Sequence, residues 1–357
     1  RPMAQGGRPP RRSLLLALLL PRWAVSTSPI VGVLTVPRLG SPCVTVPERA
    51  AHSGSAHDVV VGGSCFLALY AKYVEGAGGR VVPILYDSTD QALEEAFHSV
   101  NAVFFTGGEV DIRHTATRSA AQYLHAAALL FNLTIAANRA GTYIPLWGTC
   151  MGIQTLSIVA AGDASVLETS AYDSEGLSLP LEATRAAPSS RLLGRMPAHV
   201  LGWVTTENVT SNLHHDGVLP ATYATNERLS LLFRVLSTNR DRKGKPFVST
   251  VEARQYPIYG VQWHPERPIF SWDADEGGIN HGAHAIESMQ YFANFLVNEA
   301  RKNDHRFPSA NDERGALIYN YVPIGHSSLS WYGFPPANGS AAAADASVGW
   351  RDAALLI

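Results

Sequence analysis

A cysteine flanked by glycines is the sequence feature with the clearest chemical potential. Cys150 stands in Gly148-Thr149-Cys150-Met151-Gly152, between two apolar runs. Glycines two positions to either side permit a sharp strand-to-helix turn, the nucleophile elbow known from G-x-S-x-G motifs. A thiol at a helix N-terminus is favoured as the reactive thiolate, and the N–H of Met151 would face a developing oxyanion. Taken alone, the motif also fits a buried cysteine in a glycine-containing turn.

A histidine and a glutamate that could serve this cysteine follow much later in the chain. His264, Pro265 and Glu266 come directly after a predicted strand, where the active-site loops of α/β proteins gather. Pro265 restricts His264 to extended geometry, so Glu266 could bind one imidazole nitrogen while the other faces a thiol. We therefore expect a Cys-His-Glu arrangement with Cys150. A surface His-Pro turn is the alternative.

Two adjacent glycines, Gly107 and Gly108, follow another predicted strand. Because glycine has no side chain, backbone N–H groups here can approach a ligand closely. We expect the N–H of Gly108 to be a second oxyanion donor beside that of Met151. An ordinary strand-to-helix turn is the alternative for this segment.

The elements that must position these residues alternate between short apolar runs and amphipathic stretches. Strands are expected at 30–34, 81–85, 102–105 and 144–147, and helices at 66–74, 116–131, 153–161 and 283–301, with one more helix capped by Ser88. Short strands at 177–182, 199–204, 231–238, 248–252 and 258–263 predict antiparallel additions. The expected fold class is therefore α/β, with a flavodoxin-like, mostly parallel sheet and helices on both faces.

The composition is that of a globular protein. Of the 357 residues, 46% are hydrophobic and 16% are charged, and 28 basic against 30 acidic residues give a net charge of −2. This balance excludes a disordered or fibrous chain and gives no electrostatic reason to expect nucleic acid as a partner. We expect one domain over residues 29–335.

The two ends of the chain differ from this domain. Arg11 and Arg12 precede the apolar run 14–20 and small residues follow, so residues 1–28 are expected to be a secretory signal peptide. An upstream translated sequence or an uncleaved anchor is the alternative. Residues 336–357 are rich in Ala, Gly and Ser and are expected to form a disordered tail.

Three sequons, at Asn132, Asn208 and Asn338, agree with secretion. No later run approaches the roughly 20 apolar residues that span a bilayer, so no membrane span is expected in the mature protein.

The motifs around Cys150 and His264 resemble those of class I glutamine amidotransferases. Flanking segments narrow the resemblance to the γ-glutamyl hydrolase family: P-I-V-G-V-L from residue 29, A-K-Y-V-E-G-A-G-G-R-V-V-P from residue 71 and G-G-E-V-D from residue 107. The resemblance covers about residues 29–335. It implies an extracellular, lysosomal or vacuolar hydrolase of folylpoly-γ-glutamates that uses no metal or organic cofactor.

Carried over to this sequence, the resemblance makes Cys150 the nucleophile, His264 its acid/base partner and Glu266 the orienting carboxylate. Tyr70 resembles a family tyrosine near the site. The expected reaction is attack of Cys150 on the γ-amide carbonyl, followed by hydrolysis of a thioester.

Other positions match the family less simply. His214 resembles a family histidine near the bound glutamyl group, but its neighbour His215 leaves the register open. Gln154 stands where many γ-glutamyl hydrolases have Glu and amidotransferases have Gln. The segment 45–63 fits the family poorly.

Two residue groups could mislead. Cys43 and Cys65 could pair in an oxidising compartment, although Cys65 falls in a helical pattern that favours core packing. His281, His284 and Glu287 have the spacing of one helix face and could imitate a metal site, but an ordinary polar helix start is favoured.

Two other functions stay open: a glutaminase that passes ammonia to a synthase, and a non-catalytic γ-glutamyl-binding protein. The intact Cys-His-Glu set argues against the second. The sequence leaves the oligomeric state open, a homodimer included.

Overall fold

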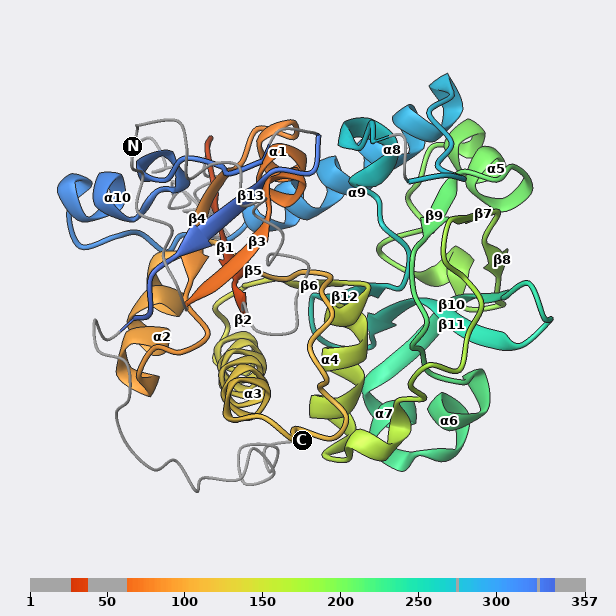
Figure 1. Cartoon of the computed structure of the whole chain (residues 1–357), viewed down its shortest axis with the longest axis horizontal. Helices are drawn as coiled ribbons and strands as arrows, with labels where there is room; N and C mark the ends of the chain where they lie inside the picture. The colour runs from red at the N-terminus through yellow and green to blue at the C-terminus, as the bar shows by residue number, and fades with distance from the viewer. Residues whose placement is uncertain (1–26, 38–62, 274–275, 326–327, 338–357) are drawn as a thin grey trace, which may run out of the picture.

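The computed structural model describes residues 27–37, 63–273, 276–325 and 328–337. Within them, one sheet of eight strands has the order β4-β1-β5-β6-β12-β11-β10-β8 (Figure 1). The first five strands are parallel: β4 (Arg80–Ile84), β1 (Ile30–Leu34), β5 (Ala102–Phe105), β6 (Leu146–Thr149) and β12 (Ile258–Val261). Numbered along the chain, these five follow the flavodoxin-like order 2-1-3-4-5, and the predicted fold class is confirmed.

Antiparallel strands extend the sheet beyond β12, as the sequence predicts. They are β11 (Pro246–Ala253), β10 (Phe233–Arg240) and β8 (Glu182–Ala183). Two smaller antiparallel sheets flank the main one. The first comprises β13 (Trp331–Phe334), β3 (Ser64–Leu67) and β2 (Val36–Pro37), and the second comprises β7 (Leu177–Leu179) and β9 (Thr210–Asn212).

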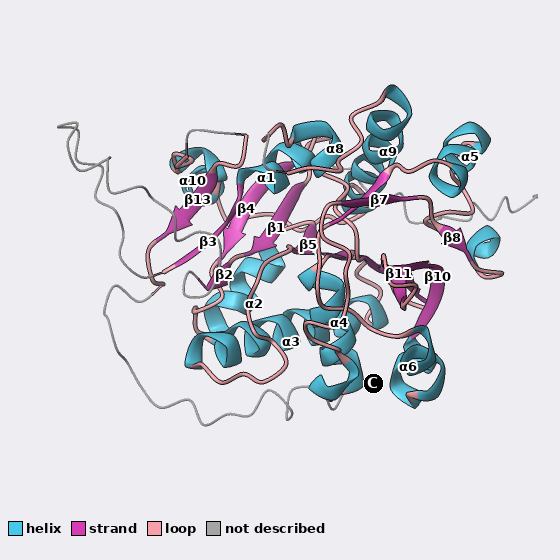
Figure 2. Ribbon diagram, turned by 45° about the vertical axis from the view of Figure 1, so that its right-hand side comes forward, coloured by secondary structure: helices cyan, strands magenta, loops and turns pink. Residues whose placement is uncertain are grey.

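Helices cover both faces of the main sheet (Figure 2). One face carries α2 (Asp90–Ser99), α3 (Arg118–Arg139) and α4 (Met151–Ala161), and the other carries α1 (Ala68–Glu75) and α9 (Ala283–Ala300). The shorter helices are α5 (Ala198–Thr206), α6 (Pro220–Thr225), α7 (Glu227–Leu232), α8 (Arg267–Phe270) and α10 (Ala310–Ala316). In the described parts of the chain, 3-10 turns lie at Ala164–Val166, Ala187–Ser189 and Ile318–Asn320.

Strand residues alternate between two apolar cores, because successive side chains of a strand point to opposite faces of a sheet. In β1, Ile30 and Leu34 pack with α2, α3 and α4, while Val31 and Val33 pack with α1 and α9. All four side chains are buried. Burial on both faces explains the continuous apolar runs that predict these strands.

Three predictions about local structure are wrong. Residues 199–204, expected as a strand, lie in α5, because Val200 and Val204 recur at helical spacing and are buried on one helix face. Residues 64–67 form β3 and pair with β13 near the other end of the chain, so α1 begins only at Ala68. Short apolar runs do not distinguish the two structures. The cap of α2 is Thr89 rather than Ser88, since its hydroxyl accepts from the N–H of Ala92.

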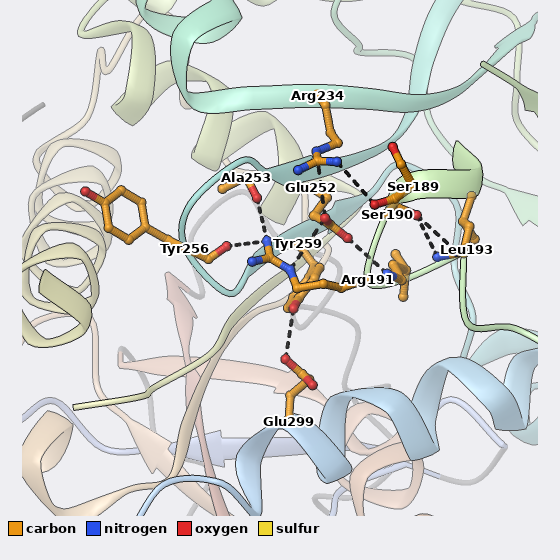
Figure 3. A network of polar contacts seen from close by, with 12 residues as sticks. Ser189, Ser190, Arg191, Leu193, Arg234, Glu252, Ala253, Tyr256, Tyr259 and Glu299 are labelled. Carbon is orange, nitrogen blue, oxygen red and sulfur yellow. Dashed lines mark hydrogen bonds and ion pairs between the residues drawn. The ribbon is translucent and has the colours of Figure 1, made fainter. Parts of the chain in front are cut away.

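A buried carboxylate and two half-buried arginines form a polar network at the antiparallel part of the sheet (Figure 3). The carboxylate of Glu252 in β11 is almost fully buried and lies 3.5 Å from Arg191 Nε and 3.8 Å from Arg234 Nε. It also accepts from the N–H of Leu192 at 2.9 Å. Arg191 donates in turn to the carbonyl of Tyr256 at 2.6 Å. These contacts join β10, β11 and the segment before α5.

The sequence features outside the parallel core have mixed outcomes. Cys65 is buried in β3 and disulfide-bonded, and Cys43 lies outside the described residues. Asn132 is buried in α3 and Asn208 is exposed after α5, whereas Asn338 lies outside the described residues. Residues 1–26, 45–62 and 338–357, which hold most of the expected leader, poorly matching segment and tail, also lie outside them.

Among the described helices, α3 alone is long and apolar enough to cross a membrane by length and composition. Of its most apolar window, 61% is buried inside the protein. Its apolar residues therefore form part of the core against α2 and α4.

Candidate active site

Cys150 occupies a strained turn between β6 and α4. Its backbone angles are φ 53° and ψ −110°, a combination that non-glycine residues rarely adopt. The two flanking glycines make this turn possible. A Cβ at Gly148 would lie 2.7 Å from the backbone of Gly152, and a Cβ at Gly152 would lie 2.1 Å from the carbonyl oxygen of Phe105. The predicted elbow geometry is therefore present.

The elbow is held at the carboxyl edge of the parallel strands. The N–H of Cys150 donates to the carbonyl of Val261 at the end of β12, at 2.8 Å. Cys150 is 6% exposed, and its Sγ lies 3.9 Å from the carbonyl oxygen of Leu213, after β9. Within the described chain Cys150 is the free cysteine.

His264 and Glu266 lie beside this thiol. His264 Nδ1 is 2.6 Å from Glu266 Oε1, and both side chains are buried. Burial would lower the pKa of His264, but the Glu266 carboxylate and the hydrogen-bonded Cys150 outweigh it and raise this pKa to about 10. The imidazolium is thus stabilised between a carboxylate and a sulfur.

The glycine pair closes the other side of the site. The N–H of Gly107 donates to the Tyr70 hydroxyl at 2.9 Å, and burial, with the charge of Glu266, raises the pKa of Tyr70 well above its usual value. A Cβ on Gly107 would lie 2.5 Å from this hydroxyl and 2.9 Å from His264 Cε1. Tyr70 is therefore a neutral phenol at the active centre.

Gly108 lies against the side chain of Met151. A Cβ on Gly108 would lie 3.0 Å from Met151 Cε. Met151 is the first residue of α4, and the first N–H groups of a helix have no acceptor within it. The N–H of Met151, the residue after Cys150, therefore has no acceptor within α4.

His214 and His215 differ in burial. The His214 side chain is buried and its Nδ1–H donates to the carbonyl of Asp216 at 2.8 Å, whereas His215 is largely exposed. Burial lowers the pKa of His214 to about 3, so its ring is neutral. Gln154 donates to the same Asp216 carbonyl at 3.0 Å and thereby supports the turn that carries His214.

His281, His284 and Glu287, which have the spacing of a metal site, contact different partners. His281 stacks on Trp272, with ring centroids 4.2 Å apart. His284 Nδ1 lies 3.0 Å from Glu207, and Glu287 contacts His199 at 3.1 Å. Within the described parts of the chain no group of three or more metal-binding side chains is found.

Some site residues escape sequence reasoning. Arg267 follows Glu266 directly and lies 3.6 Å from its carboxylate, but an arginine beside a motif carries no signal of its own. The close approach of Gly107 to Tyr70 and His264 depends on three distant segments. Its only sequence signal is its place in the Gly-Gly pair.

The fold and the thiol–imidazole–carboxylate site define a cysteine hydrolase. The Peptidase C26 family model matches residues 42–266. The chain belongs to the γ-glutamyl hydrolase family within this class.

Relatives support that membership along most of the chain. γ-Glutamyl hydrolase from Homo sapiens is 39% identical over 263 residues, which cover 74% of this chain and 79% of that protein. γ-Glutamyl hydrolase B from Dictyostelium discoideum is 34% identical over 302 residues, covering 84% and 80%. Among solved structures, PurLQS from Thermotoga maritima matches with a TM-score of 0.39 at 15% identity, covering 76% of this chain and 98% of that one.

Proposed function

We propose that this enzyme hydrolyses the γ-glutamyl bonds of folylpoly-γ-glutamates, with Cys150 as nucleophile. The observation that carries the proposal is the contact between Cys150, His264 and Glu266 in a chain that belongs to the γ-glutamyl hydrolase family. The products are glutamate or poly-γ-glutamate and a shortened folate conjugate.

The proposed reaction begins with attack by the thiolate of Cys150 on the γ-amide carbonyl. The oxyanion that develops accepts from the N–H groups of Gly108 and Met151, which are fixed before the substrate arrives. Tyr70 and His214 contact the glutamyl group. His214 is suited to this because the Nδ1–H donates to Asp216 and leaves Nε2 as a hydrogen-bond acceptor.

Proton transfer follows from the charges around His264. The imidazolium gives its proton to the leaving α-amine as the tetrahedral intermediate collapses to a thioester. Once sulfur is acylated, the Cys150 thiolate no longer raises the pKa of His264. His264 can then take a proton from water, which attacks the thioester, while Glu266 holds the ring throughout. These steps use only residues of the chain and water.

Product analysis on a defined poly-γ-glutamyl folate tests the proposal. Wild-type protein should shorten the chain, and folded Cys150→Ala should not. Iodoacetamide should inactivate the wild type by modifying Cys150. Full activity in Cys150→Ala would exclude this mechanism.

Gln154 is the residue that favours the alternative function, a glutaminase. Its amide supports the His214 turn, so a role in binding free glutamine is not needed to explain it. We expect kcat/KM to be higher for poly-γ-glutamyl chains than for glutamine, with the purified protein alone. A preference for glutamine would favour the amidotransferase alternative.

We further propose that residues 29–335 form a single domain, which agrees with a sheet and helices built from residues 30–334. The exposed sequon at Asn208 and the signal-like segment 1–28 support entry into the secretory pathway, followed by secretion or delivery to a lysosome or vacuole.

A further inference from the structure

Glu266 is a fully buried carboxylate whose charge is only partly balanced by His264. Its Oε1 bonds His264, but among the described residues its Oε2 has no hydrogen-bond partner. A buried carboxylate needs a nearby cation or several donors to stay ionised. Besides His264, the cation beside Glu266 in the described part of the chain is Arg267, whose Nε lies 3.6 Å from Oε1.

Arg267 is itself held from the other side. It is the first residue of α8, is 8% exposed, and its Nη1 donates to Glu276. The hydroxyl of Ser271 donates to the same carboxylate, so Glu276 is bound at both oxygens. Arg267 therefore lies between the carboxylates of Glu266 and Glu276.

Contacts of the residues that follow Arg267 hold the backbone near the Arg267–Glu276 pair. His281 Nδ1–H donates to the carbonyl of Pro268 at 3.0 Å, and its ring stacks on Trp272 at 16°. The N–H of Trp272 donates to Ser328 Oγ at 2.7 Å. The segment after α8 is thus held back against the helix that begins with Arg267.

We propose that Arg267 is a positioning residue that keeps Glu266 ionised and aimed at His264, and that Glu276 holds Arg267 in this place. The inference rests on the proposed function, because it matters when His264 has given its proton to the leaving amine. At that moment the imidazole is neutral, and Arg267 is the cation left beside Glu266. A carboxylate that stays charged then accepts from Nδ1–H of the neutral imidazole. This fixes the tautomer whose Nε2 can accept a proton from water.

The groups that face Glu266 are few. His264 and Arg267 follow β12, and Tyr70 and Tyr73 approach from α1; the Glu266 charge raises the pKa of both phenols, after burial. Neither phenol is a cation. Loss of Arg267 would leave Glu266 facing the neutral hydroxyls of Tyr70 and Tyr73 and the imidazole of His264, which loses its proton in each catalytic cycle.

Steady-state kinetics of Arg267→Met, Arg267→Lys and Glu276→Gln test this role, with Arg80→Met as the matched control. Arg80 also pairs with a glutamate, Glu313, but at the start of β4. We expect Arg267→Met to lower kcat roughly 10- to 100-fold with KM changed less than about threefold, since small displacements of catalytic groups have effects of this size. Arg267→Lys should recover a large part of kcat. The kcat of Glu276→Gln should lie between those of Arg267→Met and the wild type. Arg80→Met should match the wild type.

The pH dependence separates positioning from loss of structure. A buried carboxylate that loses its cation is protonated more easily, so the acid limb of the kcat profile should move to higher pH in Arg267→Met and return in Arg267→Lys. The rate at which iodoacetamide alkylates Cys150 should also fall in Arg267→Met, and this rate does not depend on turnover.

The outcomes are distinguishable. Wild-type kcat, acid limb and alkylation rate in folded Arg267→Met would overturn the role of Arg267. If Arg267→Met does not fold, unchanged values in both Arg267→Lys and Glu276→Gln would overturn it instead. Activity of Cys150→Ala would reject the proposed function whatever the arginine variants do.

Discussion

At the residue scale, the active centre depends on positions where no side chain is tolerated. Gly148 and Gly152 let the elbow close, and Gly107 lets β5 approach both Tyr70 and His264. Each glycine removes a collision that any other residue would introduce. The reactive side chains therefore reach their positions because the glycines leave room for them, and hydrogen bonds then hold them there.

Gly107→Ala should impair catalysis without unfolding the protein. The new methyl group would lie 2.5 Å from the Tyr70 hydroxyl and 2.9 Å from His264 Cε1, so one of them must move. We expect kcat to fall roughly 100-fold, as for other displacements near 1 Å. Gly202→Ala in α5 is the control, since its methyl group meets nothing within 4 Å, and it should stabilise by about 1 kcal/mol with normal kcat. A normal kcat in Gly107→Ala would contradict the packing described here.

Glu266→Gln should lower the pKa of His264. Burial lowers this pKa, and Glu266 is the largest influence that raises it, to about 10. Because folding raises this pKa from 6.5, protonated His264 stabilises the folded protein. This contribution is fully present below about pH 6.5 and is lost as the pH rises through about 10. NMR titration of the His264 ring should show a lower midpoint in the variant, and the loss of stability should be complete at a lower pH than in the wild type. Turnover should fall while KM stays nearly constant; an unchanged midpoint would remove Glu266 from this role.

The two local motifs could be recognised in the sequence because each encodes its own geometry. Gly-x-Cys-x-Gly specifies an elbow, and His-Pro-Glu holds a carboxylate two residues from its imidazole. Arg267, Leu213 and the approach of Gly107 could not be predicted, since their roles arise where β5, β9, β12 and α8 meet. The choice of His214 over His215 likewise needed burial, which a pair of adjacent histidines does not reveal.

At the element scale, the parallel strands could be predicted because their burial on both faces leaves an apolar signature. Strand β3 could not, because its pairing with β13 joins residues more than 260 positions apart. Helix α5 cannot be predicted for a related reason, since its buried face is set by contact with α9. Tertiary partners decide such short segments.

Glu252→Gln should destabilise the antiparallel part of the sheet. The substitution leaves Arg191 and Arg234 without their buried carboxylate; because both arginines are partly exposed, we expect a cost of about 1–3 kcal/mol, below that of a fully buried ion pair. Urea unfolding should show this loss. Glu313→Gln removes a more exposed pair with Arg80 and should cost less than about 1 kcal/mol. Equal losses in the two variants would show that the network in Figure 3 adds no special stability.

At the scale of the whole molecule, functional groups gather at one edge of the sheet. Cys150, His264 and Gly107 follow β6, β12 and β5 at their carboxyl ends, and His214 follows β9 beside them. The network around Glu252 lies elsewhere in the sheet and joins β10 and β11. Loops that bind substrate can therefore vary while the sheet that aligns the nucleophile and its base stays unchanged.

Glycosylation should distinguish the described sequons. Asn208 is exposed, whereas Asn132 is buried in α3, so an attached glycan would prevent that helix from packing. When the protein is expressed through a eukaryotic secretory pathway, mass spectrometry after glycosidase treatment should find modification at Asn208 and none at Asn132. Asn208→Gln should remove that modification. A glycan at Asn132 in folded protein would contradict the packing of α3.

The backbone of Cys150 implies a conflict between durability and activity. A residue with φ 53° outside glycine carries a conformational cost of about 1–3 kcal/mol, which glycine would relieve. Cys150→Gly should therefore be inert yet melt at a higher temperature than Cys150→Ala. Selection for heat resistance alone would drive this position away from cysteine, so the thiol persists only while its chemistry is under selection.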